Sequence, residues 1–322
     1  MKNRNFIGLT GGTGFIGSAL LLNSKLNNFN MKIFGRSRLS LNEHHFVYCD
    51  LDPSFDYGDA FDDVETFIHI AAKVHVMKEM VDDPLSDFLS INALATLNLA
   101  RQAAAAGVKR FIFISSIKVN GESTFMGTPF RFDDDYKPVD PYGMSKYKAE
   151  LALKRLALDT NMELVIIRPT LVYGPGVKAN FASLMNLVCK GIPLPFGCIT
   201  KNKRSLVSIT NLVDLIITCI DHPKAANKIF LVSDDHDVST SEMVREMATA
   251  LGKPTWQIPV PLWCYTLAGK LFSKSDMVDR LTGTLQVDIT HTKETLGWTP
   301  KETLQEGFKK TAVAFLQSKS SR

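Results

Sequence analysis

The sequence predicts an α/β protein in which a doubly wound, parallel Rossmann sheet is joined to a smaller mixed α/β substrate-binding domain. Three observations predict this fold. Short apolar runs of strand length alternate with segments of helical periodicity. The glycine-rich turn Gly11 to Gly17 follows the first apolar run and precedes the first helical pattern. After Arg168-Pro169 the alternation weakens and prolines become frequent, which indicates a separate, less regular unit.

The predicted strands are apolar runs, most of them separated by helical patterns. They cover residues 5–10, 32–34, 45–49, 66–70, 110–115, 164–168 and 228–232. The clearest helices are predicted at 15–26 and 84–106, and the second ends at Ala106-Gly107, a helix-stop signal. Since crossovers between parallel strands are right-handed, we expect helices on both faces and the ligand at the carboxyl ends of the strands.

The expected dinucleotide-binding domain comprises residues 1–170 and is completed by parts of 206–233. Residues 171–205 and 234–322 are expected to form the substrate domain. The chain has 322 residues and is 45% hydrophobic, which is ample for a packed core.

The composition indicates a cytoplasmic protein. The net charge of +4 is spread along the chain, so no nucleic-acid partner or acidic membrane is implied. Five cysteines without paired spacing predict free thiols in a reducing compartment and no metal. The start lacks a signal-peptide pattern, and the apolar segment Val260 to Phe272 is too short to span a bilayer. That segment could lie on a membrane surface, but a buried or lid helix is the favoured interpretation.

The glycine turn predicts a diphosphate site at the start of the first helix. Gly11 would allow the tight turn, Gly14 the close approach of the diphosphate, and Gly17 the packing of helix on strand. Phe15 and Ile16 lie between these glycines at the helix start and are expected to contact the cofactor. A turn without a ligand is the alternative, and the position directly after the first strand favours the cofactor.

Tyr142 and Lys146 are candidates for proton transfer. A lysine four residues along a helix lies on the same face as the tyrosine, and its charge would favour the phenolate over the phenol. Tyr142 could then exchange a proton with an alcohol or carbonyl while a nicotinamide exchanges hydride. Lys146 is also expected to bond the nicotinamide ribose. The alternative is an exposed helix on which the two residues are only neighbours.

Ser115 and Ser116 end a predicted strand, where an open parallel sheet presents its site residues. One hydroxyl could hold the substrate oxygen beside Tyr142, and the alternative is capping of the strand end.

All these residues, in this order, resemble the extended short-chain dehydrogenase/reductase family, in its nucleotide-sugar epimerase and reductase branch. The resemblance includes His69-Ile70-Ala71-Ala72, Asn92, the segment from Arg168-Pro169 to Gly174-Pro175, and Leu296-Gly297-Trp298-Thr299-Pro300. It implies that Ser116 is the catalytic hydroxyl. It also implies that Asp50 and Leu51 line the adenine, and that Ala71 and Ala72 lie beside the diphosphate and ribose.

The resemblance further implies a UDP-sugar substrate. Asn180, Arg204 and Arg280 match positions that hold its diphosphate, and an arginine fork suits phosphate oxygens. The alternative for each arginine is a surface salt bridge. Lys118 is also expected to bind the substrate. The dehydratases of the family carry an Asp-Glu pair where this chain has Ile117-Lys118, so a 4,6-dehydratase is not expected.

The runs Ala71 to Met77 and Ser116 to Glu122 resemble a bacterial surface-polysaccharide subgroup that contains 4-epimerases and 4-reductases. We expect reaction at sugar position 4, with a UDP-4-keto-6-deoxy-N-acetylhexosamine 4-reductase ahead of a UDP-glucose or UDP-N-acetylglucosamine 4-epimerase. Arg36 stands where NAD enzymes commonly have an acid, which favours NADP over NAD.

Two other functions receive less support. A non-sugar alcohol or steroid-type reductase would have no reason for arginines at the uridine diphosphate positions. A non-catalytic cofactor-sensing protein would usually lack the tyrosine and lysine pair. By analogy with the family, a homodimer is expected, formed through helices that include the one bearing Tyr142.

Overall fold

A seven-stranded parallel sheet forms the centre of the protein. The computed structural model describes residues 6–38, 44–74, 83–273 and 275–320. The strand order is β3-β2-β1-β4-β5-β6-β9, and every neighbouring pair is parallel. The strands are β1 (Phe6–Thr10), β2 (Asn30–Gly35), β3 (His45–Tyr48), β4 (Val64–His69), β5 (Arg110–Ile114), β6 (Glu163–Pro169) and β9 (Lys228–Val232). The order reverses direction at β1, as it does in Rossmann folds, so the predicted fold class is confirmed.

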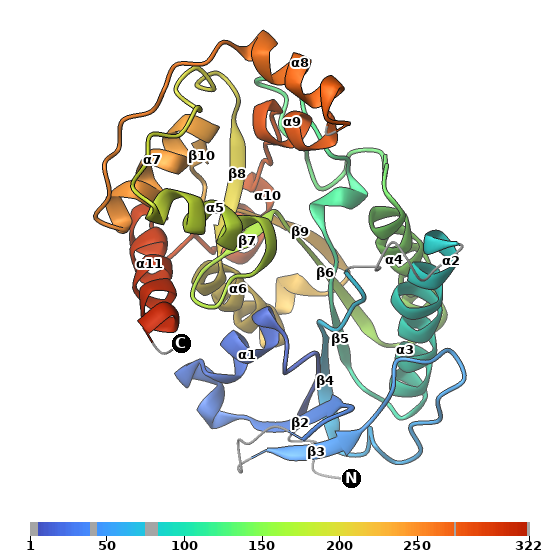
Figure 1. Ribbon diagram of the computed structural model, residues 1–322. Coiled ribbons are helices and arrows are strands. Elements are labelled where there is room, and N and C mark those ends of the chain that lie inside the picture. The colour runs from blue at the N-terminus through green and yellow to red at the C-terminus, as the bar shows by residue number, and fades with distance from the viewer. Residues whose placement is uncertain (1–5, 39–43, 75–82, 274, 321–322) are drawn as a thin grey trace.

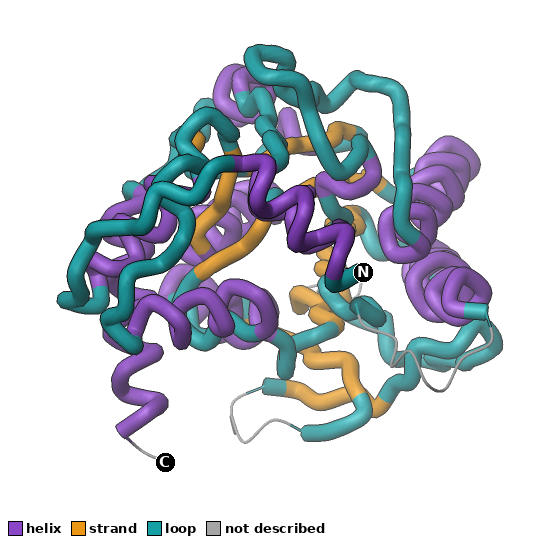
Figure 2. Tube along the Cα trace, turned by 45° about the horizontal axis from the view of Figure 1, so that its top comes forward, coloured by secondary structure: helices purple, strands orange, loops and turns teal. Residues whose placement is uncertain are grey.

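Helices cover both faces of this sheet (Figures 1 and 2). One face carries α1 (Phe15–Leu21), α6 (Ile209–Asp221) and α10 (Thr290–Leu296). The other carries α2 (Pro84–Leu89), α3 (Thr96–Ala105) and α4 (Pro141–Asp159). Because both faces are covered, the central strands are mostly apolar, and every residue of β5 is buried, including Arg110, which pairs with Glu163.

Two predicted helices differ in detail from the structure. The helix predicted at 15–26 ends at Leu21, and a 3-10 helix, η1 (Ser24–Asn28), follows it. The side chain of Asn23 accepts a hydrogen bond from the Lys25 backbone N–H and so starts this new turn. The helix predicted at 84–106 contains a π-helical turn, η2 (Ser90–Ala95), between α2 and α3. Apolar periodicity does not distinguish these local variants.

A smaller unit is built from the later chain around a mixed three-stranded sheet. Its strands, in the order β10-β8-β7, are β7 (Leu171–Tyr173), β8 (Arg204–Ser208) and β10 (Asp237–Val238), with β8 parallel to β7 and antiparallel to β10. Its own apolar core lies among α5 (Ala179–Cys189), α7 (Thr240–Ala250) and α11 (Leu304–Ser320). The remaining elements are α8 (Leu262–Leu271), α9 (Ser275–Thr282), η3 (Ile117–Val119) and η4 (Pro223–Ala225).

The favoured interpretation of residues 260–272 was a buried or lid helix, and the burial part of it is wrong. The helix α8 forms there, but Trp263, Leu267 and Leu271 are exposed. Gly269 is the buried residue of this helix. Apolar content predicted burial, whereas α8 lies at the outer end of the smaller unit, where few elements surround it (Figure 1). Among the described residues, no helix has both the length and the apolar character that crossing a bilayer requires.

Candidate active site

Three of the segments singled out from the sequence, the glycine turn, Ala71-Ala72 and Ser115-Ser116, follow strands at the carboxyl edge of the parallel sheet. Gly11 directly follows β1, Ala71 comes two residues after β4, and Ser115 directly follows β5. These three strands are neighbours, in the order β1-β4-β5. Parallel strands end at one edge, so residues from distant parts of the chain come together there.

The glycine turn requires glycine for steric reasons. Gly11 has a φ of +75°, and a Cβ there would lie 2.8 Å from the Ala71 backbone nitrogen. A Cβ on Gly17 would lie 2.2 Å from the carbonyl oxygen of Gly11. Gly14 is the N-cap of α1, and no side chain caps this helix start, at which Phe15 and Ile16 are the first residues. The backbone geometry therefore fits a ligand that approaches the helix start closely, as a dinucleotide diphosphate would.

His69 joins the ends of β1 and β4 beneath this turn. Its ring nitrogens bond the hydroxyls of Thr10 at 2.8 Å and Thr96 at 2.9 Å. Burial, with a smaller contribution from Lys146, lowers the pKa of His69 to about 3, so the ring is neutral. Thr10 also accepts a hydrogen bond from the Ala71 backbone nitrogen at 3.4 Å. This network fixes the segment that contains Ala71 and Ala72, both of them half-buried.

Tyr142 lies in the first turn of α4. Pro141 occupies the first helical position, and the Asp140 carboxylate accepts a hydrogen bond from the Gly143 N–H at 2.6 Å. The Tyr142 ring lies edge-on to Phe88 of α2, with centroids 6.1 Å apart. Burial, with a smaller contribution from Asp140, raises the pKa of the Tyr142 phenol above its usual value. The predicted lowering of this pKa by Lys146 is therefore not found in this arrangement.

Lys146 is almost fully buried one turn after Tyr142. Its ammonium donates a hydrogen bond to the carbonyl of Ile114 at the end of β5, at 2.8 Å, and lies 4.5 Å from the centroid of the Phe113 ring. Burial lowers the pKa of Lys146 to about 7, while Glu150 acts in the opposite direction. An ammonium has three donors, and Ile114 accepts from one. The remaining donors suit the hydroxyls of a ribose.

The two serines after β5 have different surroundings. The Ser115 hydroxyl is buried and donates to Glu150 at 2.5 Å. The Ser116 hydroxyl is half-buried and accepts a hydrogen bond from the Lys118 backbone N–H at 3.3 Å. Ser115 therefore has a structural partner, whereas the Ser116 hydroxyl donates to no other described residue.

The side chain of Lys118, a predicted substrate contact, pairs with protein carboxylates. It forms ion pairs with Asp140 and, at 3.1 Å, with Glu122. The structure thus gives Lys118 a role in fixing the start of α4, because Asp140 is the N-cap of that helix.

Arg204, one of the predicted diphosphate residues, contacts the backbone of the segment that contains Arg280. The Arg204 guanidinium donates to the Arg280 carbonyl at 2.9 Å and to the Gly283 carbonyl at 3.3 Å. Burial, and then the charge of Arg280, lowers the pKa of Arg204. Two cations held close together favour an anion between them. Asn180 belongs to α5, but its side chain lies outside the described part of the structure.

The predicted adenine-side residues lie at the ends of β2 and β3. Arg36 directly follows β2 and is exposed. Asp50 is exposed and accepts a hydrogen bond from the Leu51 N–H at 2.9 Å, while Leu51 is half-buried. They occupy the same edge of the sheet as the glycine turn, because β2 and β3 are parallel to β1. Of the motif Ala71 to Met77, residues 75–77 lie outside the described residues.

A buried polar network, not predicted from the sequence, lies behind the site. Glu150 accepts from Arg168 and Ser115, and Arg168 also donates to Asn120 at 2.9 Å. Glu150 lies four residues after Lys146, so Tyr142, Lys146 and Glu150 share one face of α4. The network could have been predicted from the sequence, because polar residues recur at intervals of four along one face of an otherwise packed helix.

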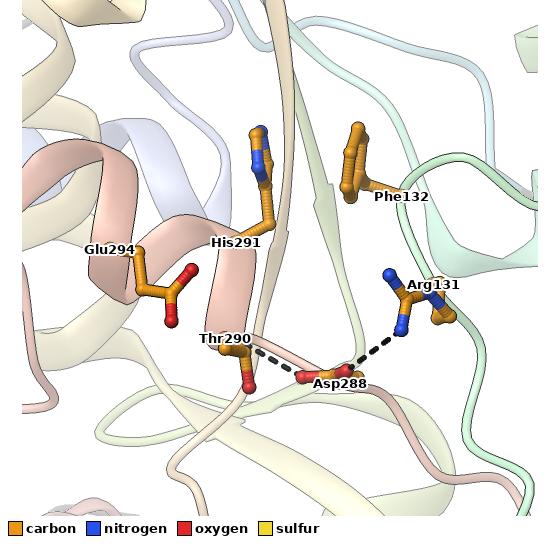
Figure 3. Close-up of a pocket in the computed structure, with 6 residues that line it drawn as sticks. All are labelled: Arg131, Phe132, Asp288, Thr290, His291 and Glu294. Carbon is orange, nitrogen blue, oxygen red and sulfur yellow. Dashed lines mark hydrogen bonds and ion pairs between the residues drawn. The ribbon is translucent and has the colours of Figure 1, made fainter.

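A small cavity elsewhere does not contain these residues. It has a volume of about 150 Å³, which is below the range of typical small-molecule sites. Figure 3 shows the Phe132 and His291 rings face to face at its edge, with centroids 3.7 Å apart. The lining residues are Arg131, Phe132, Asp288, Thr290, His291 and Glu294. The sheet edge, where the predicted residues meet, is therefore the candidate active site.

The fold and the site define a short-chain dehydrogenase/reductase of the extended, nucleotide-sugar type. A family model for the NAD dependent epimerase/dehydratase family matches residues 7–233, and the chain belongs to that family.

Two curated relatives and a solved structure illustrate the similarity. The chain is 62% identical over 312 residues to a UDP-glucose 4-epimerase of Vibrio cholerae, covering 96% of this chain and 95% of the relative. It is 28% identical to an N-acetyl-alpha-D-glucosaminyl-diphospho-ditrans,octacis-undecaprenol 4-epimerase of Escherichia coli O157:H7, covering 94% and 93%. The structure of a UDP-glucuronic acid 4-epimerase from Bacillus cereus in complex with NAD superposes with a TM-score of 0.78 at 18% identity, covering 97% and 99%.

Proposed function

We propose that the protein is a UDP-sugar 4-epimerase, with UDP-glucose or UDP-N-acetylglucosamine as substrate. The observation that carries this proposal is the 62% identity, over nearly the whole chain, to the UDP-glucose 4-epimerase of Vibrio cholerae. From the sequence alone, a 4-reductase was expected ahead of the 4-epimerase. The relatives support the epimerase, which was the alternative, and the reductase remains a prediction that the test below distinguishes.

In the proposed reaction, Tyr142 exchanges a proton with the oxygen at sugar position 4. Ser116 holds that oxygen through its hydroxyl, and Lys146 donates hydrogen bonds to the nicotinamide ribose. Bound NAD supplies a hydride acceptor and donor for the adjoining carbon. Epimerisation requires that the sugar present its other face before the hydride returns.

The sugar is held by its diphosphate in this proposal. Arg204 and Arg280 provide two guanidinium groups, and Asn180 provides an amide. Anchoring at the diphosphate leaves the hexose free to turn, which an epimerase needs. Replacing Arg280, which is exposed, by Met should raise the KM for UDP-glucose about tenfold or more, because one charge-assisted contact is lost. The value of kcat should change much less.

NAD is the proposed cofactor, because an epimerase recovers its hydride and consumes no external reductant. The family name and the Bacillus cereus complex support this choice. The preference for NADP, expected from Arg36, stays a prediction. Calorimetry with both dinucleotides tests it: Arg36→Ala should weaken NADP binding about tenfold and leave NAD binding nearly unchanged, since NAD lacks the 2′-phosphate.

A panel of UDP-glucose, UDP-N-acetylglucosamine and a UDP-4-keto-6-deoxy-N-acetylhexosamine, each incubated with NADH and NADPH, tests the reaction class. The epimerase proposal expects a 4-epimer without net consumption of reduced cofactor. Stoichiometric oxidation of NADH or NADPH with the keto sugar, and no epimer, would instead establish the reductase.

Tyr142→Phe tests the acid/base assignment. Turnover should fall by at least about a thousandfold, in line with the loss of a general acid/base, while the affinity for the dinucleotide remains. The matched control is Tyr147→Phe on the same helix, whose ring lies 4.8 Å from that of Tyr136 and away from the proposed chemistry. Equal turnover in both variants would refute the role of Tyr142.

A lipid-linked sugar diphosphate is a second candidate substrate. The Escherichia coli relative is named for such a substrate. The exposed apolar helix α8 lies directly against α9, which contains Arg280. Assay of N-acetylglucosaminyl-diphospho-undecaprenol in detergent, in parallel with UDP-N-acetylglucosamine, decides between the two: the better kcat/KM identifies the substrate.

We also propose that the protein is a homodimer. Each chain is divided into a dinucleotide-binding domain, residues 1–170 with parts of 206–233, and a substrate domain, residues 171–205 and 234–322. Leu94 of η2 and Leu151 of α4 are exposed on adjacent elements, which supports association through these helices. Sedimentation of wild type and Leu94→Glu/Leu151→Glu measures this: the wild type should have twice the mass of the variant.

A further inference from the structure

One face of α8 is apolar and exposed. Trp263, Leu267 and Leu271 follow one another at intervals of four residues, so their side chains lie on the same face. Their exposed fractions are 67%, 60% and 74%. Leu262 and Phe272, at the two ends of the helix, are also exposed. Single exposed apolar residues are common, but a row of large ones on one helix indicates a binding surface.

The opposite side of α8 attaches it to the protein. Gly269 is buried against α9, where an added Cβ would lie 2.8 Å from a methyl carbon of Val278. Tyr265 packs against the core of the smaller unit. In Figure 1, α8 forms the end of the molecule opposite β3, so its apolar face is at an extremity, where a broad surface can reach it.

The charges around α8 indicate which kind of partner surface this helix binds. Residues 254–269 contain no Asp, Glu, Lys or Arg, and the first charged residue on either side is a lysine, Lys253 or Lys270. Lys270 is exposed and lies on the same face as Trp263 and Leu267. An apolar face with tryptophan, bordered by cations, is typical of helices that lie at the boundary between lipid headgroups and acyl chains.

We propose that the face formed by Trp263, Leu267, Lys270 and Leu271 docks on an anionic phospholipid bilayer, parallel to its plane. The apolar side chains enter the headgroup boundary, and Lys270 contacts lipid phosphates. A second copy of the chain fits this face less well. In a twofold interface centred on α8, the Lys270 of each copy would be enclosed among apolar side chains, and α8 contains no Asp or Glu to pair with it.

Docking through α8 would also bring the proposed diphosphate site close to the bilayer. Arg280 belongs to α9, the helix on which α8 packs, and its carbonyl accepts a hydrogen bond from Arg204. An enzyme so placed meets sugar diphosphates at the membrane surface, whether they are free or lipid-linked. The docking itself does not depend on which substrate is used, and it rests on α8 alone.

Flotation with vesicles tests the proposal on the full-length protein. Vesicles of 30% phosphatidylglycerol in phosphatidylcholine should bind the protein, and pure phosphatidylcholine should bind it more weakly. The variant Trp263→Ser/Leu267→Ser/Leu271→Ser should lose at least about tenfold in vesicle affinity, because three large side chains no longer leave water. Lys270→Gln should lose roughly fivefold on the anionic vesicles, the value of one cation near such a surface.

A matched control separates this face from exposed apolar residues in general. Leu22 is 75% exposed and Leu271 is 74% exposed, but Leu22 lies at the end of α1. Leu271→Ser should weaken binding, whereas Leu22→Ser should not. Turnover of soluble UDP-glucose should be unchanged in all these variants, which shows that they fold and keeps this test separate from that of the proposed reaction.

Three outcomes would overturn the proposal. The first is no binding of the wild type to anionic vesicles, and the second is an equal loss in the Leu22→Ser and Leu271→Ser variants. The third is wild-type self-association that is abolished by the triple variant in sedimentation, which would assign the face to a second copy. Quenching of tryptophan fluorescence by brominated lipid, retained in Trp256→Phe and lost in Trp263→Phe, would place Trp263 within the bilayer.

Discussion

The carboxylate of Glu150 and the guanidinium of Arg168 form a bidentate ion pair, with hydrogen bonds of 2.9 Å and 2.6 Å, and both side chains are completely buried. The pair joins α4 to β6, one helical turn beyond Lys146. It therefore fixes the helix that carries the proposed proton-transfer residues against the strand that supports them.

Removing one partner of this ion pair should lower the free energy of unfolding. Glu150→Gln leaves the Arg168 charge buried without its carboxylate, and the free energy of unfolding should fall by roughly 3–5 kcal/mol. Urea unfolding measures the change. Asp159→Asn is the control, because it removes the exposed partner of Arg155 on the same helix and should cost under about 1 kcal/mol. Similar losses in both variants would contradict the structural role given to Glu150.

Gly17→Ala should destabilise the protein and abolish dinucleotide binding. The new Cβ would overlap the carbonyl oxygen of Gly11, 2.2 Å away, so the turn must move. A loss of roughly 2–4 kcal/mol is expected from such a backbone clash. Gly35→Ala is the control, because nothing lies within 4 Å of a Cβ there. Thermal unfolding and calorimetric titration with NAD provide the two measurements.

His69 should make the protein sensitive to acid. Its pKa is about 3 in the folded protein and about 6.5 when unfolded, so between these values the unfolded chain binds one more proton. Stability should therefore fall by about 1 kcal/mol per pH unit as the pH drops from 6.5 toward 3. Comparing unfolding of the wild type and His69→Asn at pH 7 and pH 4.5 isolates this contribution. An identical pH slope in the two proteins would exclude it.

Lys146 should lower the stability of the folded protein near pH 7, although it contributes to the proposed active site. Burial holds its pKa at about 7, below the ordinary value of 10.5, so the unfolded chain binds more protons between these values. Stability from this group should rise as the pH increases from 7 toward 10, and Lys146→Met should lack the rise. The variant should also bind NAD less tightly, because the ribose loses its donors. Chemical unfolding from pH 7 to pH 9 and calorimetry test both effects.

The local patterns of the sequence were sufficient to predict the Rossmann fold class and to find the motifs at the sheet edge. Gly11, Ser116 and Tyr142 are far apart in the chain, yet each follows or starts a regular element, and parallel strands bring such ends together. Fold class and family membership followed from these local signals.

Only the tertiary structure decided what each side chain meets. It paired Lys118 with Asp140 and Glu122, directed Ser115 to Glu150, and placed Lys146 in an environment that lowers its pKa. It also left α8 exposed, although its composition suggested burial. Periodicity along a chain reports which residues share a face, whereas burial and electrostatics depend on neighbours that the fold brings from elsewhere.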